Sequence, residues 1–177
     1  AFAAQRFDIQ PDLMTTAKGL TNGSVPMGAV FVADKVHKAF MTGPDNAIDF
    51  FHGYTYSGHP LACAAAIASL DIYAEENLFE KAIELEQYWQ DSIHALKGLP
   101  NVIDIRNFGL IGAIELAPRA GKPGTRAYDV FTNCFHEKNV LTRVTGDVIA
   151  LSPPLILEKS HIDELFSRIA DAIKETA

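Results

Sequence analysis

A lysine set among small residues is the first position in this sequence that could do chemistry. Lys18 lies in the run Thr15-Thr-Ala-Lys-Gly-Leu-Thr-Asn-Gly23, where it ends an apolar stretch and stands directly before a glycine. We expect Gly19 to allow an unusual backbone turn at this point. Most lysines are simply exposed, and that is the alternative interpretation. A lysine shielded from water in such a turn would instead be able to act as an amine nucleophile.

A loop rich in hydroxyl groups is the second candidate. The run Phe51-His-Gly-Tyr-Thr-Tyr-Ser-Gly-His-Pro60 places Thr55 and Ser57 between glycines, just before a predicted helix. Because hydroxyl donors at a helix N-terminus suit a negative charge, the loop could bind an anionic group. The alternative is that these hydroxyls cap the helix, and the residues alone do not decide between the two.

An arginine near the C-terminus is the third candidate. Arg143 lies in Leu141-Thr-Arg-Val-Thr-Gly-Asp-Val-Ile-Ala-Leu-Ser-Pro-Pro-Leu155. Its guanidinium fork could pair with a carboxylate through two hydrogen bonds. Taken alone, the residues favour an ordinary ion pair with Asp147 across the turn. His52 and His59 have no partners at metal-ligand spacing, so no metal site is predicted.

The first part of the chain must position the lysine and the loop. Residues 12–17 are predicted to be extended, and the continuous apolar run 28–32 is typical of a buried strand. A short helix is expected over 34–40, capped by its first residue. Residues 43–58 show no period and predict a long loop of the kind that is often functional. Pro60 and the alanines after it then predict a helix.

A second helix follows and carries the boundary between the two parts of the chain. Its apolar stripe is formed by Leu78, Ala82, Leu85, Trp89, Ile93 and Leu96. This spacing places the stripe on one helix face, with charged residues opposite. Gly98 and Pro100 end the helix.

The remaining residues predict a small α+β unit. Strands are expected over 102–106, 110–116, 140–143 and 148–151. A helix over 126–138 is expected to turn Tyr128, Val130, Phe131 and Phe135 inward. Ser160 and Asp163 resemble a capping pair for a final helix. The inward face of that helix is predicted to hold Ile162, Leu165, Phe166, Ile169 and Ile173.

Composition excludes several classes of partner. The 177 residues carry a formal net charge of −7 and their basic residues do not cluster, so we expect no binding to nucleic acid. No apolar stretch has the length of a membrane helix, so no membrane association is predicted. Cys63 and Cys134 form neither a disulfide framework nor a zinc motif, and Cys63 is expected to be a small buried residue. These features favour a cytoplasmic protein.

The lysine segment also carries a family resemblance. The run Phe7-Asp-Ile-Gln-Pro-Asp-Leu-Met-Thr-Thr-Ala-Lys-Gly-Leu-Thr-Asn-Gly-Ser-Val-Pro-Met-Gly-Ala29 closely resembles the cofactor-lysine segment of class III aminotransferases. These are enzymes of fold type I that depend on pyridoxal 5'-phosphate (PLP). The resemblance implies an α/β fold: the end of the PLP-binding large domain over 1–75, a connecting helix over 76–98, and a small C-terminal α+β domain over 99–177. It further implies that Lys18 holds PLP as a Schiff base and later acts as the base.

The other two motifs fit the same family. The hydroxyl loop resembles the pattern H-G-x-T-x-x-G-x-P, in which the threonine of one subunit binds the PLP phosphate of its neighbour. Thr55 would therefore bind that phosphate, with Tyr54 beside it, in a homodimer or a tetramer of dimers. The R-x-x-G-D stretch resembles the ω-transaminase branch, where the arginine binds the α-carboxylate of the keto acid. Arg143 inherits that role, and Gly109-Leu-Ile-Gly112 is structural in the family.

The resemblance thus implies a transaminase that moves an amino group from an ω-amino acid or a primary amine to pyruvate. Alternatives are another class III PLP enzyme (an aminomutase, a decarboxylase or an acetylornithine-type transaminase) or a non-catalytic fragment that acts as a dimerisation module. The run of residues 1–10 leads us to expect that the chain begins within a domain. The family residues that pair with the PLP ring nitrogen and stack on the ring are expected upstream, so this chain alone is predicted to be inactive.

Overall fold

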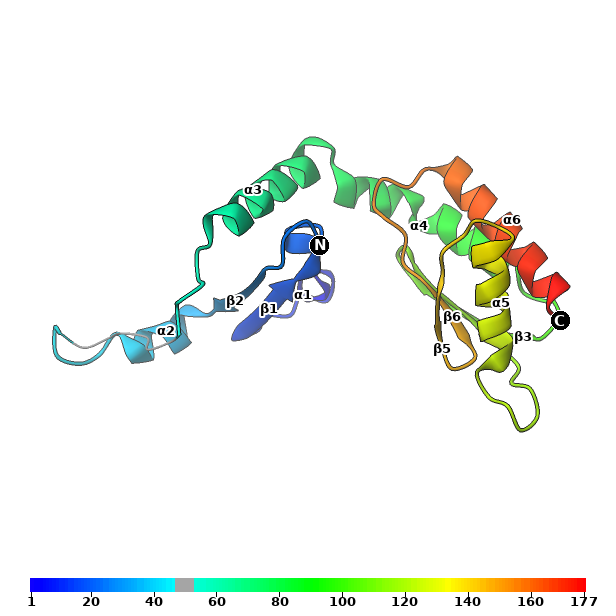
Figure 1. The fold of residues 1–177 in the computed structure, drawn as a ribbon. Coiled ribbons are helices and arrows are strands. Elements are labelled where there is room, and N and C mark those ends of the chain that lie inside the picture. The colour runs from blue at the N-terminus through cyan, green and yellow to red at the C-terminus, as the bar shows by residue number, and fades with distance from the viewer. Residues whose placement is uncertain (47–52) are drawn as a thin grey trace. The chain divides into compact units, whose positions relative to one another are not determined.

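A computed structural model describes residues 1–46 and 53–177 of the chain. The chain divides into two compact units, Ala1–Asn77 and Leu78–Ala177. Each unit is described by itself below (Figure 1). No helix in the described parts of the chain is both long enough and apolar enough to cross a bilayer.

The first unit is built on a strand pair and a long helix. Its elements are α1 (Ala3–Arg6), β1 (Leu13–Ala17), the 3-10 turn η1 (Lys18–Leu20), β2 (Gly28–Val32), α2 (Asp34–Phe40) and α3 (Pro60–Glu75). Strands β1 and β2 are antiparallel, with Ala17 opposite Gly28 next to the turn (Figure 1). Both predicted strands and both predicted helices of this part are confirmed. Residues 47–52 of the predicted loop lie outside the described residues.

Three local expectations for this unit were wrong. The N-cap of α2 is Ala33 rather than Asp34. Asp34 is the first helical residue, where its negative charge interacts favourably with the helix dipole. Cys63 is only half-buried. The side chains of Val30 and Phe31 in β2 are 60% and 52% exposed, so β2 is not a buried strand in this unit.

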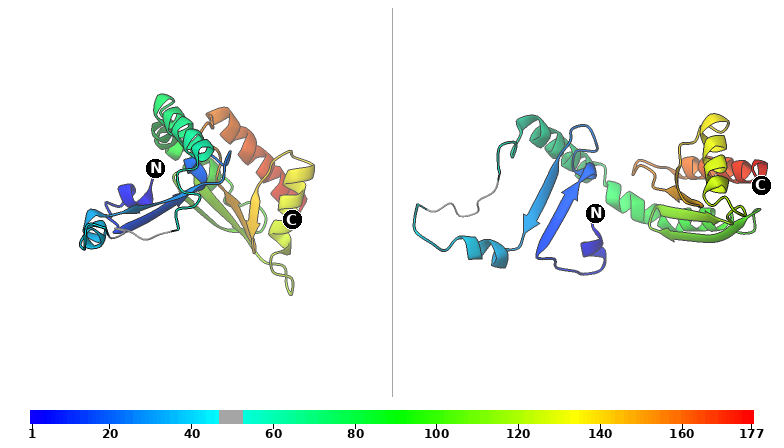
Figure 2. Two further views of the ribbon diagram at one scale, coloured as in Figure 1. Left: turned by 60° about the vertical axis from the view of Figure 1, so that its left-hand side comes forward. Right: turned by 60° about the horizontal axis from the view of Figure 1, so that its bottom comes forward.

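The second unit is a four-stranded antiparallel sheet with three helices. Its elements are α4 (Leu78–His94), β3 (Val102–Phe108), β4 (Ile111–Leu116), α5 (Thr125–His136), β5 (Arg143–Thr145), β6 (Val148–Leu151) and α6 (Lys159–Glu175). The strand order is β3-β4-β6-β5. Figures 1 and 2 show α5 and α6 side by side, and α6 also contacts α4.

One hydrophobic core holds this unit together. It joins one face of the sheet to the inner faces of the three helices. The α4 stripe is confirmed, with Trp89 and Ile93 fully buried. The predicted inner face of α6 is also confirmed: Leu165 is half-buried and the other four residues are buried. Burial of these large side chains is the main stabilising contribution to the unit.

The predicted inner face of α5 was wrong by one residue. Tyr128 and Phe135 are 57% and 50% exposed, whereas Ala127, Val130 and Cys134 are buried. Both stripes have the same i, i+3, i+7 spacing, so periodicity alone could not separate them. Ala127 and Cys134 are small, which lets the helix lie close to its neighbours, and Val130 belongs to both predicted and observed faces. Burial also raises the pKa of the Cys134 thiol to about 11.

Element boundaries in this unit also differ from the prediction, and two of the differences, at β5 and α6, are described here. Strand β5 covers Arg143–Thr145 rather than residues 140–143. The N-cap of α6 is Glu158, whose backbone N–H donates to His161 Nδ1 at 3.1 Å, and Ser160 lies inside the helix. Short capping patterns overlap here, and the observed cap begins two residues before the predicted one.

Candidate active site

Lys18 stands at the end of β1 in a strained turn. Its φ is +56°, a left-handed value that costs energy for a residue with a Cβ atom. Gly19, which we expected to take up the unusual conformation, does not have a positive φ. The carbonyl oxygen of Lys18 accepts hydrogen bonds from the N–H groups of Thr21 and Gly23, each at 3.3 Å. The turn, rather than the glycine, therefore holds the lysine backbone in place.

The Lys18 side chain is exposed in this chain, so the shielding from water that we expected is not present. Within the described residues its amine forms no hydrogen bond or ion pair. By contrast, Lys35 pairs with Asp12 at 2.6 Å and Lys38 pairs with Asp34 at 3.8 Å. The Lys18 amine is thus available to an incoming group.

Two residues that sequence reasoning missed support this turn. Thr21 is buried, and its Oγ1 donates to the Val25 carbonyl at 2.6 Å. Tyr73, on α3, donates its hydroxyl to the Gly19 carbonyl at 2.8 Å. The only signal for Thr21 was a threonine in a glycine-rich turn, where hydroxyls often bond to nearby backbone. No local signal pointed to Tyr73, because its partner lies 54 residues away.

The hydroxyl loop leads directly into α3. Within its described residues, 53–59, the Ser57 N–H donates to the Tyr54 carbonyl at 2.9 Å, and Gly58 has a φ of +66°. Thr55 is exposed and Tyr54 is 54% exposed. The N-cap of α3 is His59, and no side-chain hydrogen bond caps the helix. The capping alternative for the hydroxyls is therefore not observed, and His52 lies outside the described residues.

The loop and the segment that leads from the lysine turn into β2 together line a groove of about 430 Å³. Its lining comes from residues 25–28, residues 56–59 and Ala62. The structure thus assembles the segments that flank Lys18 and Thr55 within one unit, although neither residue lines the groove itself.

Arg143 is the first residue of β5 and lies opposite Ala150 on β6. It is exposed, and it forms no ion pair with any described residue. The pair with Asp147 that the residues alone favoured is not formed. Asp147 Oδ2 instead accepts a hydrogen bond from the Gly124 N–H at 2.6 Å, at the N-cap of α5. This bond anchors the β5–β6 turn to α5 and leaves the guanidinium of Arg143 uncommitted.

Arg143 lines a cavity of about 580 Å³ within the second unit. Arg168 also lines this cavity, but it is committed to Glu164 and to the Lys138 carbonyl, the latter at 2.6 Å. Of these two arginines, Arg143 is the one available to an anionic ligand. Lys18, Tyr54 and Thr55 belong to the first unit and Arg143 to the second.

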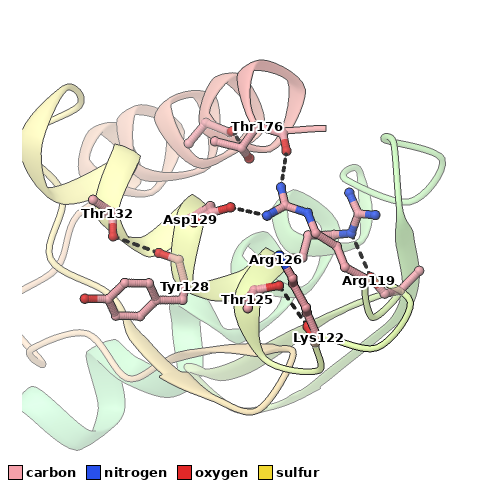
Figure 3. A network of polar contacts seen from close by, with 10 residues as sticks. Arg119, Lys122, Thr125, Arg126, Tyr128, Asp129, Thr132 and Thr176 are labelled. Carbon is pink, nitrogen blue, oxygen red and sulfur yellow. Dashed lines mark hydrogen bonds and ion pairs between the residues drawn. The ribbon is translucent and has the colours of Figure 1, made fainter.

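Polar contacts around the N-terminal half of α5 have a structural role (Figure 3). Arg119 pairs with Asp129 and donates to the Thr176 carbonyl at 3.2 Å. Arg126 donates from Nε to the Ala117 carbonyl at 2.7 Å. These bonds tie the segment before α5 to α5 itself and to the end of α6, and we assign them no role in chemistry. Across residues 1–46 and 53–177, no three His, Cys, Asp or Glu side chains gather to hold a metal ion.

Comparison with known proteins decides the family. The sequence model described as Aminotransferase class-III matches residues 1–173. The chain belongs to the class III aminotransferases. The predicted family is therefore confirmed.

Individual relatives agree with this assignment. The chain is 56% identical over 168 residues to an omega-aminotransferase of Caulobacter vibrioides, covering 95% of this chain and 38% of that protein. It is 42% identical over 176 residues to a beta-alanine–pyruvate aminotransferase of Pseudomonas aeruginosa, covering 98% of this chain and 39% of that protein. The chain thus spans less than half the length of these relatives.

Solved structures show the fold. An (S)-enantioselective omega-transaminase from Thermomicrobium roseum matches with a TM-score of 0.86 and 31% identity, over 98% of this chain and 39% of that one. A transaminase from the marine bacterium Virgibacillus matches with a TM-score of 0.85 and 35% identity, over 99% of this chain and 41% of that one. The predicted α/β fold of the PLP-dependent transaminases is confirmed.

The available groups of this chain suit PLP, which carries an aldehyde and a phosphate. The amine of Lys18 is exposed and uncommitted, as a group that condenses with an aldehyde must be. The hydroxyl of Thr55 is exposed in a glycine-flanked turn, which is suitable for a phosphate oxygen. The donor set therefore fits the cofactor of the family.

Proposed function

We propose that this chain is the C-terminal part of a PLP-dependent ω-transaminase, which moves an amino group from an ω-amino acid or a primary amine to pyruvate. The observation that carries the proposal is Lys18, an uncommitted lysine in a fixed turn of a class III aminotransferase chain. The names of the relatives at 56% and 42% identity support the ω-amino donor, and the second of them names pyruvate.

Lys18 has two roles in this proposal. Its amine would hold PLP covalently as a Schiff base before the amino substrate takes its place. The freed amine would then move a proton between the substrate carbon that bears the amino group and the cofactor, in opposite directions in the two half-reactions. PLP, when bound, supplies the electron sink that makes this carbon acidic. The turn fixes the Lys18 backbone from which the side chain extends in both roles.

Thr55 binds the phosphate of PLP in this proposal, and Tyr54 lies next to it in the sequence. The hydroxyl of Thr55 donates to a phosphate oxygen, and backbone N–H groups of the turn add further donors. The loop is proposed to serve the site of a neighbouring subunit, so the active protein is a homodimer or a tetramer of dimers.

Arg143 recognises the carboxylate of the keto acid in this proposal. Its guanidinium has no competing ion pair among the described residues, and it lines a cavity of about 580 Å³. A bidentate pair with a carboxylate fixes both the position and the orientation of the substrate. Asp147 contributes indirectly, because it anchors the turn after β5 to α5.

The proposed domain organisation assigns residues 1–75 to the PLP-binding large domain, 76–98 to a connecting helix and 99–177 to the small domain. We also propose a cytoplasmic location, which the two free cysteines support. The activity belongs to the longer protein in this proposal, since other parts of the PLP site lie outside these residues.

The test is covalent trapping in the full-length enzyme. Borohydride reduction followed by peptide mass spectrometry should find PLP on Lys18, and Lys18→Ala should lose the adduct. We expect that variant to lose transaminase activity by about a thousandfold or more. Lys38→Ala is the matched control, since Lys38 is an exposed lysine of the same unit. An adduct on another lysine, or full activity of Lys18→Ala, would refute the proposal.

A further inference from the structure

Tyr73 makes a contact that connects α3 to the turn of Lys18. Its hydroxyl donates a hydrogen bond of 2.8 Å to the carbonyl oxygen of Gly19, the residue directly after the lysine. The two partners are separated by 54 positions in the sequence. The contact is therefore a tertiary one, and it joins a 16-residue helix to a three-residue turn.

The carbonyl that Tyr73 holds belongs to a glycine, whose backbone is intrinsically flexible. Gly19 lacks a Cβ atom, so its backbone has more accessible conformations than that of any other residue type. A Cβ atom at Gly19 would lie 3.4 Å from the Tyr73 hydroxyl, which shows how closely the ring approaches. The hydroxyl fixes the direction of the Gly19 carbonyl and thereby restricts rotation next to Lys18.

The turn has a reason to need this support. Lys18 has a φ of +56°, and a strained backbone persists only where surrounding contacts hold it. The N–H groups of Thr21 and Gly23 hold the Lys18 carbonyl from within the turn. Tyr73 is the partner that reaches the turn from the helix after the hydroxyl loop.

We infer that Tyr73 is a positioning residue for Lys18: its hydroxyl, bonded to the Gly19 carbonyl, holds the strained turn in which the lysine amine meets the cofactor and the substrate. The inference rests on the proposed function. Tyr73 does not touch the reacting atoms, and it acts through the backbone of Gly19 and Lys18.

The test compares Tyr73→Phe with Tyr128→Phe in the full-length enzyme. The first substitution removes only the hydroxyl, and the second removes the hydroxyl of an exposed tyrosine on α5. Amide hydrogen exchange of Thr21 and Gly23 reports on the turn with or without PLP. Loss of one net hydrogen bond should speed this exchange about fivefold in Tyr73→Phe and leave the control unchanged. Exchange along α3 confirms that the helix remains folded.

Steady-state kinetics supply the second measurement. We expect kcat of Tyr73→Phe to fall about fivefold with little change in the KM for either substrate, because the substitution displaces the amine and leaves the groups that bind substrate in place. Unchanged exchange at Thr21 and Gly23 would overturn the inference. Faster exchange with an unchanged kcat would also overturn it, since the bond would then be structural only. Trapping of PLP on a lysine other than Lys18 would instead refute the proposed function, while the exchange rates would still report whether Tyr73 holds the turn.

Discussion

The close approach of α4 to the sheet depends on the absence of a side chain at Gly112. This residue lies on β4, and a Cβ atom there would be 2.5 Å from Ile93 Cδ1. The same atom would also be 3.4 Å from Trp89 Nε1 and 3.5 Å from Trp89 Cζ2. Ile93 and Trp89 are both fully buried in the core, where close packing resists displacement of the Ile93 side chain.

The cost of Gly112→Ala follows from this geometry. Carbon atoms pack at about 3.5–4.0 Å, so Ile93 would have to shift by roughly 1 Å or more. Overpacking of this kind costs about 1–3 kcal/mol in the free energy of unfolding. Replacing a glycine also lowers the conformational entropy of the unfolded chain, which offsets about 0.4–1 kcal/mol of this destabilisation at most. We therefore expect a net loss of about 1–2 kcal/mol.

Urea unfolding followed by tryptophan fluorescence measures this loss, because Trp89 is the only tryptophan in the chain and lies in the core concerned. Gly53→Ala is the control, since nothing lies within 4 Å of its Cβ position. Ile93→Val removes the clashing Cδ1 atom, so the double variant should lose less stability than the two single variants together. Equal stability of Gly112→Ala and Gly53→Ala, or strict additivity in the cycle, would refute the reasoning.

Three further predictions concern the substrate site, the C-terminus and the thiols. In the full-length enzyme, Arg143→Ala should raise the KM for pyruvate by at least about tenfold and leave the KM of an amine without a carboxylate unchanged; unaltered use of pyruvate would remove the assigned role. The hydrogen bond from Lys138, with a second from Asn133, lowers the pKa of Glu175, so its contribution to stability is present above its ordinary pKa of 4.5 and is lost as the pH falls through the lower folded value. Glu175→Gln should therefore reduce the acid dependence of the unfolding midpoint below about pH 4.5, and identical acid profiles would contradict this. Because burial raises the pKa of Cys134 to about 11, a thiol reagent at pH 8 should modify the half-buried Cys63 in the native chain and Cys134 only after unfolding, as mass spectrometry of the labelled peptides would show.

Several features of the fold could be predicted because they depend on residues close together in the sequence. The apolar run of β2, the proline at the start of α3 and the stripe of α4 each act over one or two turns or a few strand positions. Family membership could be predicted for a related reason. The segment around Lys18 resembles the cofactor-lysine segment of the family over a long run without gaps, and its residues are neighbours in the sequence.

Other features were decided by contacts between distant residues. The inner face of α5 depends on which of two equally spaced stripes fits closely, and the small side chains of Ala127 and Cys134 fit where Tyr128 and Phe135 do not. Asp147 bonds to the Gly124 N–H rather than to Arg143, because the β5–β6 turn lies against the start of α5.

The lysine shows the same division most clearly. The sequence by itself determined that Lys18 stands at the end of a strand before a glycine-rich turn, since strand pattern and turn composition are local properties. Only the tertiary structure decided that Lys18, not Gly19, takes the left-handed conformation and that Tyr73 holds the next carbonyl. The physical reason is that a strained backbone persists only where surrounding contacts hold it, and the contact from Tyr73 is set by packing rather than by sequence spacing.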